Sequence, residues 1–520
     1  MEDSPHTTVV ISSKDLTLPE LVAVARGYAP VELSESVKSD ITRSREAVEK
    51  MLEERRVVYG ITTGFGSFAD RVIDPDETKQ LQRNLIESHA CGIGNPLPED
   101  VVRAMILLRV KSLSKGHSGI RLVTVEKLIE MLNKKLTPVV PEKGSLGSSG
   151  DLCPLSHMVL PLLGKGEAIY RGEHLSGEAA MQRAGIKTIE LEAKEGLALN
   201  NGTQCMTAIG ALAVYDSLHL LEYAEMTAGL TLEALNGRMD AFDPRIHALR
   251  GQEGQIESAR KMNLCLEGST FVYDEERATT IRVQDAYALR CIAQVHGASR
   301  DAINFVLNIV LREMNAVTDN PLIFYDGNHV EAISGGNFHG QPMALPMDFL
   351  CIALAEIANI SERRLERMLN DDLSNGLPSY LTEKGGLNSG FMIVQYSAAA
   401  LVSENKVLAH PASVDSIPSS NNQEDHVSMG TISARKCAEI LENTRQVIAM
   451  EMLTAAQAVD LRRKLYGEAE HGAISLLLYN AIRAKVPYMD MDRVMAPDIK
   501  DVAGIIKNES LTKGRFASER

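Results

Sequence analysis

Apolar residues recur along much of the chain at steps of three and four positions, the spacing of one face of an α-helix. Three such stripes are Ile303, Val306, Val310 and Met314; Leu350, Leu354, Ile357, Ile360, Leu365 and Met368; and Ile440, Leu441, Ile448 and Met452. Two stretches without glycine or proline, 286–296 and 431–463, predict helices of many turns. The pattern therefore predicts a mainly α protein, an elongated bundle of long helices.

Strand patterns are few and short. Val9–Ile11 and Thr188–Leu191 are candidate strands because β-branched residues dominate them. Leu322–Tyr325 and Val330–Ile333 flank Asp326-Gly327, a sequence typical of a hairpin with a tight turn. We expect these small β elements at the edges of the helical bundle.

Length and composition limit the domain organisation and the expected partners. The 520 residues predict two subdomains, 1–200 and 201–520, with a soft boundary because no Pro-rich linker separates them. With 54 basic and 69 acidic residues, a net charge of -15 and no basic run, the chain is not expected to bind nucleic acid. No signal segment is evident at the start, and no apolar stretch reaches the ~18 residues of a membrane span. We therefore expect a soluble cytoplasmic protein that does not bind membranes.

Seven cysteines are spread along the chain without a Cys-x-x-Cys pair. An odd number in this arrangement argues against a disulfide framework and against a structural zinc site. We expect them to be buried thiols, and no metal site is predicted.

A loop rich in glycine and serine, Gly144–His157, carries unusual chemistry. If the amide nitrogen of Gly150 attacks the carbonyl carbon of Ser148, a five-membered ring closes, and loss of two waters converts Ser149 into a methylidene. Gly150 has no Cβ to hinder the attack, and Ser149 has a hydroxyl that can leave. A phosphate-binding loop and a nucleophilic serine are the alternatives. The loop lacks the Lys-Ser/Thr pair of the first and the strand-flanked Gly-x-Ser-x-Gly spacing of the second.

This segment resembles the active-site loop of the aromatic amino-acid ammonia-lyases and aminomutases. That family carries a 4-methylideneimidazol-5-one (MIO) group formed autocatalytically from Ala-Ser-Gly. The triplet here, Ser148-Ser149-Gly150, departs at its first position. That residue gives the ring only its carbonyl carbon, so we expect the extra hydroxyl to be tolerated. The resemblance extends from about residue 55 to about residue 500. It implies a fumarase/aspartase-like architecture, no external coenzyme, and a homotetramer whose active sites are each built from three subunits.

The resemblance also implies a general base. Tyr59 stands in a Gly-rich loop, 58–66, that is similar to the catalytic Tyr-Gly loop of the family. A tyrosine in water has a pKa near ~10, so this role requires cationic or polar neighbours.

Further residues are implied to bind substrate by the same resemblance. Asn201, in a segment that ends in Asn-Gly-Thr-Gln, is expected to contact the electrophile and the substrate amine. The stretch 283–291 is expected to supply Gln284 to the MIO environment, Tyr287 to the substrate and Arg290 to its carboxylate. An arginine fork suits a carboxylate because it donates two parallel hydrogen bonds. Phe338 is expected to line the pocket.

Two positions bear on the choice of substrate. His89, in Ser-His, and Glu424, in Asn-Gln-Glu-Asp, are similar to the branch of the family that acts on histidine. An imidazole offers one donor and one acceptor, which a carboxylate and a histidine or backbone group can satisfy. The resemblance implies conversion of L-histidine to trans-urocanate and ammonia. The alternatives are a tyrosine or phenylalanine lyase, a 2,3-aminomutase, and a helical scaffold that has lost catalysis.

Overall fold

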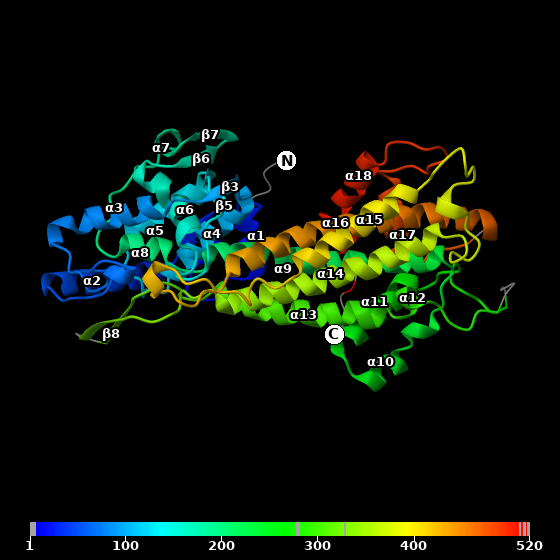
Figure 1. Cartoon of the computed structure of the whole chain (residues 1–520), viewed down its shortest axis with the longest axis horizontal. Helices are drawn as coiled ribbons and strands as arrows, with labels where there is room; N and C mark the ends of the chain where they lie inside the picture. The colour runs from blue at the N-terminus through cyan, green and yellow to red at the C-terminus, as the bar shows by residue number, and fades with distance from the viewer. Residues whose placement is uncertain are drawn as a thin grey trace. The chain divides into compact units, whose positions relative to one another are not determined.

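The computed structural model describes residues 7–276, 281–326, 329–467, 469–508, 511–512 and 516. Eighteen α-helices and nine short strands lie within these ranges (Figure 1). The protein is therefore mainly α with small β elements, which confirms the predicted fold class. Its residues form two compact units, each assembled from segments that alternate along the chain.

Unit 1 comprises Met1–Leu212, Leu307–Asp348 and Pro411–Arg435. Its helices are α1 (Leu18–Ala25), α2 (Glu35–Glu53), α3 (Thr78–His89), α4 (Glu99–Leu113), α5 (Leu122–Asn133), α6 (Leu152–Val159), α7 (Gly177–Ala184) and α8 (Glu195–Asn200). Its strands are β1 (Val9–Ile11), β2 (Val31–Leu33), β3 (Ile93–Pro96), β4 (Leu136–Pro138), β5 (Pro141–Lys143), β6 (Glu167–Tyr170), β7 (Glu173–Ser176), β8 (Leu322–Asp326) and β9 (His329–Ile333). Strands β1 and β2 pair in parallel, whereas β3–β5, β4–β6–β7 and β8–β9 are antiparallel.

Unit 2 comprises Ala213–Val306, Phe349–His410 and Lys436–Arg520. The helices that lie wholly within it are α10 (Pro244–Arg250), α11 (Glu253–Leu266), α12 (Tyr287–Arg290), α15 (Met392–Leu408), α17 (Ala473–Arg483) and α18 (Ala496–Ile506). Four long helices contribute residues to both units: α9 (Gln204–Ala234), α13 (Ile292–Glu313), α14 (Gln341–Leu369) and α16 (Gly430–Tyr466). The domain division predicted between residues 200 and 201 stays a prediction, because these units are defined by compactness alone.

The helical pattern of the sequence is confirmed in its main features. Every residue of the three apolar stripes is buried. The first stripe lies on α13 and the residue that follows it, the second on α14 and the third on α16. The stretch 431–463 lies inside α16. The stretch 286–296 is not one helix, because α12 ends at Arg290 and α13 begins at Ile292.

The strand predictions fare unevenly. Val9–Ile11 forms β1, and the predicted hairpin is β8–β9, although its turn residues Gly327 and Asn328 lie outside the described part of the chain. Thr188–Leu191 is not a strand. Its backbone makes isolated contacts, such as Ile189 N–H to the Leu162 carbonyl at 2.9 Å, rather than a ladder of hydrogen bonds.

Helix α14 corrects the expectation that no apolar stretch is long enough to span a membrane. In the described residues, this one helix has an 18-residue window with a mean hydropathy of 1.6. Since 67% of that window is buried inside the protein, packing against neighbouring elements accounts for its apolar composition.

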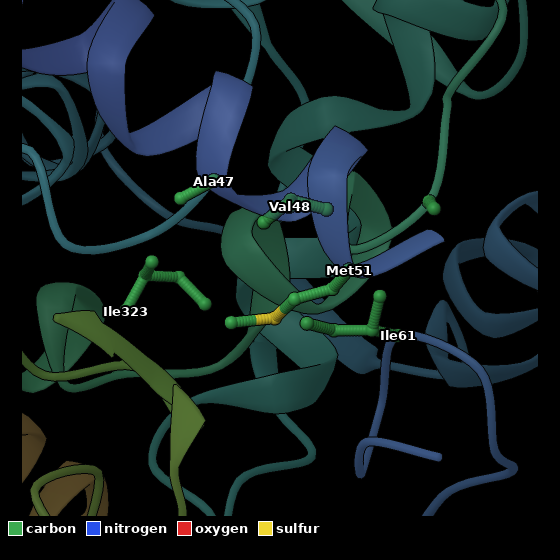
Figure 2. Close-up of a cluster of buried hydrophobic side chains, with 6 residues drawn as sticks. Ala47, Val48, Met51, Ile61 and Ile323 are labelled. Carbon is green, nitrogen blue, oxygen red and sulfur yellow. The ribbon is translucent and has the colours of Figure 1, made fainter. Parts of the chain in front are cut away.

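The segment that carries Tyr59 is anchored by a small hydrophobic cluster. Ile61 packs with Ala47, Val48 and Met51 of α2 and with Ile323 of β8 (Figure 2). Ile61 is fully buried. The cluster fixes the loop two residues after Tyr59, and so limits where that side chain can lie.

Ile61→Ala should lower the free energy of unfolding by about 2–5 kcal/mol, the usual cost of emptying a buried aliphatic site. Val57→Ala is the matched control, because Val57 precedes Tyr59 by two residues but is 68% exposed. Surface substitutions of this kind change stability by at most about 0.5 kcal/mol. Denaturant unfolding of both variants checks the prediction, and equal losses would contradict the anchoring role of the cluster.

Candidate active site

One cavity in unit 1 gathers most of the residues singled out in the sequence. Its volume is about 1140 Å³. The predicted site residues among its lining are Tyr59, His89, Ser148, Ser149, Asn201, Phe338 and Glu424. They come from separate parts of the chain, which the fold brings to one place.

Ser149 lies at the centre of this group. Its hydroxyl donates a hydrogen bond to Glu424 Oε1 at 2.7 Å, and its backbone carbonyl accepts one from Asn201 Nδ2 at 2.9 Å. Glu424 Oε2 accepts a further hydrogen bond from the Ser419 hydroxyl at 2.9 Å. The serine loop therefore contacts directly the carboxylate that the sequence indicated as a substrate-binding group.

Two glycines allow the serine loop to approach the segment after α8. Gly150 has a φ of +71°, and a Cβ there would lie 2.1 Å from the Gly202 carbonyl oxygen. Gly150 and Gly202 form an isolated β-bridge, and the Asp151 N–H donates to the Gly202 carbonyl at 2.6 Å. No Cβ on Gly150 fits against the Gly202 carbonyl, and a Cβ on Gly202, whose φ is +145°, would lie 2.5 Å from a nitrogen of the Arg109 guanidinium, so both positions require glycine.

A buried layer of charged and polar groups supports this contact from beneath. The fully buried Arg109 guanidinium donates to the carbonyl of Ala198 at 3.1 Å, to that of Asn201 at 2.8 Å, and to the Gln204 side chain. Burial lowers the pKa of Arg109 to about 10, opposed by the charges of Asp319 and Asp151. The guanidinium stays charged at neutral pH and fixes the backbone on both sides of α8's C-terminal end.

Asp151, the residue after the Ser-Ser-Gly triplet, is also fully buried. Its carboxylate accepts hydrogen bonds from the Ser145 hydroxyl and the Met206 N–H, both at 2.9 Å, and from the Thr431 hydroxyl. Burial raises the pKa of Asp151, while these hydrogen bonds lower it. The sequence reading missed both Asp151 and Arg109. For Arg109, the sequence indicates a buried role only through its position among the apolar residues of α4.

Tyr59 lines the cavity from the loop anchored by Ile61. Its hydroxyl oxygen accepts a hydrogen bond from the Gly66 N–H at 3.3 Å. Arg71, a cation that also lines the cavity, stacks on Phe68 with its guanidinium carbon 5.0 Å from the ring centre. A polar contact of the expected kind is therefore present at the phenol oxygen.

His89 is the last residue of α3, the helix that packs against α6 and α8. Burial lowers its pKa, an effect opposed by a backbone hydrogen bond with Leu85 and by the charge of Glu424. The net shift is downward, so the imidazole is mainly neutral at pH 7 and can both donate and accept a hydrogen bond. Its Nδ1 lies 3.0 Å from the Ser88 hydroxyl.

Phe338 lines the cavity from the loop that follows β9. The next residue, His339, makes a hydrogen bond from its Nε2 to the His426 carbonyl at 3.1 Å. Because His426 is two residues beyond Glu424, this contact ties the Phe338 loop to the Glu424 loop.

Gln284, Tyr287 and Arg290 belong to unit 2, and none of them lines the cavity of unit 1. They form a cluster of their own. Arg290 donates a hydrogen bond to the Gln284 side chain, and its guanidinium carbon lies 4.9 Å above the centre of the Tyr287 ring. Tyr287 is 71% exposed. In this single chain, the three residues expected to bind the substrate are therefore grouped but do not line the cavity.

A Ser-Gly loop whose serine contacts a carboxylate and an asparagine, in a cavity that a tyrosine also lines, fits one class of enzyme, the ammonia-lyases and aminomutases that act on aromatic amino acids. The chain belongs to the aromatic amino acid lyase family, which it matches over residues 16–484. It is thus an enzyme of the ammonia-lyase type.

Individual relatives cover nearly the whole chain. The histidine ammonia-lyase of Alkaliphilus oremlandii is 59% identical, over 96% of each protein. The crystal structure of histidine ammonia-lyase from Trypanosoma cruzi matches with a TM-score of 0.90 and 40% identity, over 99% of this chain and 96% of that one. That of tyrosine aminomutase from Streptomyces globisporus matches with a TM-score of 0.91 and 38% identity, over 98% of each.

Gly150→Ala should destabilise the protein more than an alanine at an unconstrained glycine. Gly172 is the matched control, since its φ of +79° is similar but no atom lies within 4 Å of its Cβ position. The left-handed backbone costs about 1–2 kcal/mol in either variant. Only Gly150→Ala adds the collision with Gly202. Thermal unfolding should show the larger fall in Tm for Gly150→Ala, and equal falls would refute the packing argument.

Proposed function

We propose that the protein is a histidine ammonia-lyase that converts L-histidine to trans-urocanate and ammonia, in the degradation of histidine. The observation that carries this proposal is the pairing of His89 and Glu424 in one cavity with Ser149. The Alkaliphilus relative, named as a histidine ammonia-lyase and 59% identical, supports the choice of substrate. The seven cysteines, an odd number spread without a Cys-x-x-Cys pair, support a location in the reducing cytoplasm.

We propose that Ser148, Ser149 and Gly150 mature into MIO, with no external coenzyme. The surroundings suit this group. Gly150 is held where no Cβ fits, and the buried Oδ1 of Asn201 has no hydrogen-bond partner among the described residues, so it is available to a new group or to the substrate. Once formed, MIO supplies an electrophilic carbon for the amine of the substrate.

Maturation would also change the environment of Glu424. In the unmodified chain, the Ser149 hydroxyl donates to Glu424 Oε1 at 2.7 Å. That hydroxyl is lost as water when the methylidene forms, which leaves Oε1 without its donor. A partly buried carboxylate then gains by accepting from another N–H, and the imidazole ring of histidine offers one.

The remaining residues of the cavity have separate tasks in this proposal. Tyr59 accepts a β-proton of the substrate at its phenol oxygen. The Gly66 N–H already donates to that oxygen and can stabilise the negative charge of a phenolate. Asn201 holds the Ser149 carbonyl through Nδ2 and offers Oδ1 to the substrate amine. The neutral His89 serves the second nitrogen of the substrate ring, and Phe338 covers the ring.

We further propose that Arg290 binds the substrate carboxylate in the cavity of another subunit, with Gln284 and Tyr287 beside it. In this proposal the protein is a homotetramer, and each active site is built from three subunits. The exposure of Tyr287 and the absence of all three residues from the lining of the cavity in the single chain support this arrangement.

A tyrosine or phenylalanine enzyme is the alternative within the family. The matching structure of a tyrosine aminomutase means that the fold alone does not decide between substrates. Polar groups at the ring-binding end of the cavity favour histidine, because a phenyl ring would leave a carboxylate without a donor.

Wild-type protein should have an intact mass lower by two waters than its sequence, with the loss located in the peptide that contains Ser149. Ser149→Ala removes the hydroxyl that must leave, and should show the unmodified mass and no turnover. Ser148→Ala should stay active, because only its carbonyl carbon enters the ring. Peptide mass mapping and near-ultraviolet absorbance check this, and an active wild type without dehydration would exclude MIO.

Shared active sites predict complementation between inactive subunits. As pure proteins, Tyr59→Phe should lose at least ~10²-fold in kcat, as a removed acid–base group does, and Arg290→Ala should lose most of its kcat/KM because the substrate carboxylate loses its partner. Co-expressed in one cell, they should regain measurable activity, since some sites would combine an intact Tyr59 with an intact Arg290. Tyr59→Phe with Ser149→Ala is the matched negative control, because both residues line the same cavity of one chain. No recovery in the first mixture, with mixed tetramers verified by mass, would refute the proposed role of Arg290.

The ring-binding pair predicts strong selectivity. Sites that hydrogen-bond a substrate can reject an analogue without the bonding atom by ~10⁴-fold, so the wild type should barely use phenylalanine. Glu424→Ala should cut kcat/KM for histidine severely, and His89→Phe should shift the preference toward phenylalanine. Glu87→Ala, two residues before His89 and outside the cavity lining, is the control. A Glu424→Ala variant that handles histidine normally would remove the basis for the proposed substrate.

A further inference from the structure

Two cysteines lie beside the candidate site without lining it. Cys91 follows His89, the last residue of α3, by two positions, and Cys153 follows Ser149 by four positions in the first turn of α6. Neither is among the residues that line the cavity. Cys91 is exposed and Cys153 is buried.

The fold places the Cys153 sulfur beside the backbone that follows Cys91. The Cys153 sulfur lies 3.2 Å from the Cβ position of Gly92, the residue that follows Cys91, so it lies against the Cys91–Gly92 backbone. A second glycine also leaves space for this sulfur, which lies 2.7 Å from the Cβ position of Gly144. Gly92 immediately precedes β3 and Gly144 immediately follows β5. Because these two strands are paired, the fold itself holds both glycines near the Cys153 sulfur.

The two thiols differ in exposure to solvent, and therefore in how readily an oxidant reaches each of them. Burial raises the pKa of the Cys153 thiol to about 11, and its interactions with Cys91 modify that shift. Cys153 therefore carries little thiolate at neutral pH. Cys91 is open to solvent, so a small oxidant reaches its sulfur first.

We propose that Cys91 and Cys153 form a reversible disulfide when the protein meets a peroxide, and that this bond alters the binding of substrate. The Cys91 thiolate attacks one peroxide oxygen, the O–O bond breaks, and the departing hydroxide takes a proton to leave as water. Cys91 becomes a sulfenic acid. The Cys153 sulfur then bonds to the Cys91 sulfur, the S–O bond breaks, and hydroxide leaves with the Cys153 proton as a second water. Two thiols supply the two electrons that reduce the peroxide.

The position of the pair gives the disulfide an effect on the cavity. Cys91 N–H donates to the His89 carbonyl at 3.0 Å, and Gly92 N–H donates to His157 Nε2 of α6 at 3.0 Å. A disulfide needs a sulfur–sulfur distance near ~2.05 Å, shorter than any contact between two thiols. Closing it draws the C-terminal end of α3, and with it His89, toward the first turn of α6. The effect on substrate binding rests on the proposed function, whereas formation of the disulfide does not.

The test uses the full-length protein, reduced, freed of reductant and then treated with hydrogen peroxide. Free thiols are alkylated, and peptides are mapped by mass. A cross-linked pair of peptides containing Cys91 and Cys153 is expected, with an intact mass lower by two hydrogens. The KM for histidine should rise several-fold with a smaller change in kcat, and dithiothreitol should reverse both changes.

Two variants distinguish this pair from other thiols. Cys153→Ala should form no cross-link, should keep its KM in peroxide, and should accumulate a Cys91 sulfenic acid that dimedone traps. Cys205→Ala should still form the disulfide. Cys205 is the matched control because it is a buried thiol whose pKa burial raises, as for Cys153.

Three outcomes would overturn the proposal. They are a cross-link between Cys153 and Cys205, over-oxidation of Cys91 without any cross-link, and a Cys91–Cys153 disulfide that leaves the KM unchanged. A reduced protein that does not turn over histidine, yet forms the disulfide, would instead count against the proposed function. The mass measurement and the kinetic measurement therefore separate the two hypotheses.

Discussion

The site depends on one close contact between two stretches of backbone, Gly150 against Gly202. A Cβ on Gly150 would lie 2.1 Å from the Gly202 carbonyl oxygen, and a Cβ on Gly202 would lie 2.5 Å from the Arg109 guanidinium. A side chain at either position would therefore disrupt the contact. The contact places the Ser149 carbonyl at Asn201 Nδ2 and the Ser149 hydroxyl at Glu424. Every role proposed for the cavity assumes this arrangement.

The contact is held from beneath by buried charges. Arg109 binds the backbone carbonyls on the Asn201 side, and Asp151 binds hydroxyl and amide donors on the serine side. Burying a charge without hydrogen bonds is costly, so losing one of these partners would leave the other groups unsatisfied. A base held by several hydrogen bonds suits a loop whose backbone atoms must meet in order to react.

Local pattern predicted the helices well, because a buried face repeats with the period of the helix itself. The residues of α14 and α16 show this. Local pattern failed at Thr188–Leu191, where a strand needs a partner that a single segment does not reveal. The break between α12 and α13 at Cys291 carries no glycine or proline, so no residue in the sequence marked it.

The candidate site was predictable only where motifs carried it. The Ser-Ser-Gly triplet was found from its own chemistry and by resemblance, and Tyr59 and Asn201 by resemblance. The structure places Tyr59, Asn201, Ser148 and Ser149 along one cavity. The hydrogen bond between Ser149 and Glu424 joins residues 275 positions apart, and no local signal could predict it. Arg290 was also assigned by resemblance, but it does not line that cavity in the single chain, and its part in the site stays a prediction.

The central claim is that this cavity acts on histidine through a group made from Ser149. The most direct test is an ultraviolet assay of the purified protein with L-histidine, L-tyrosine and L-phenylalanine in parallel, since urocanate, coumarate and cinnamate have distinct spectra. The account predicts rapid formation of urocanate and almost no cinnamate or coumarate. Equal catalytic efficiency on histidine and tyrosine, or no urocanate from protein shown to be dehydrated at Ser149, would contradict it.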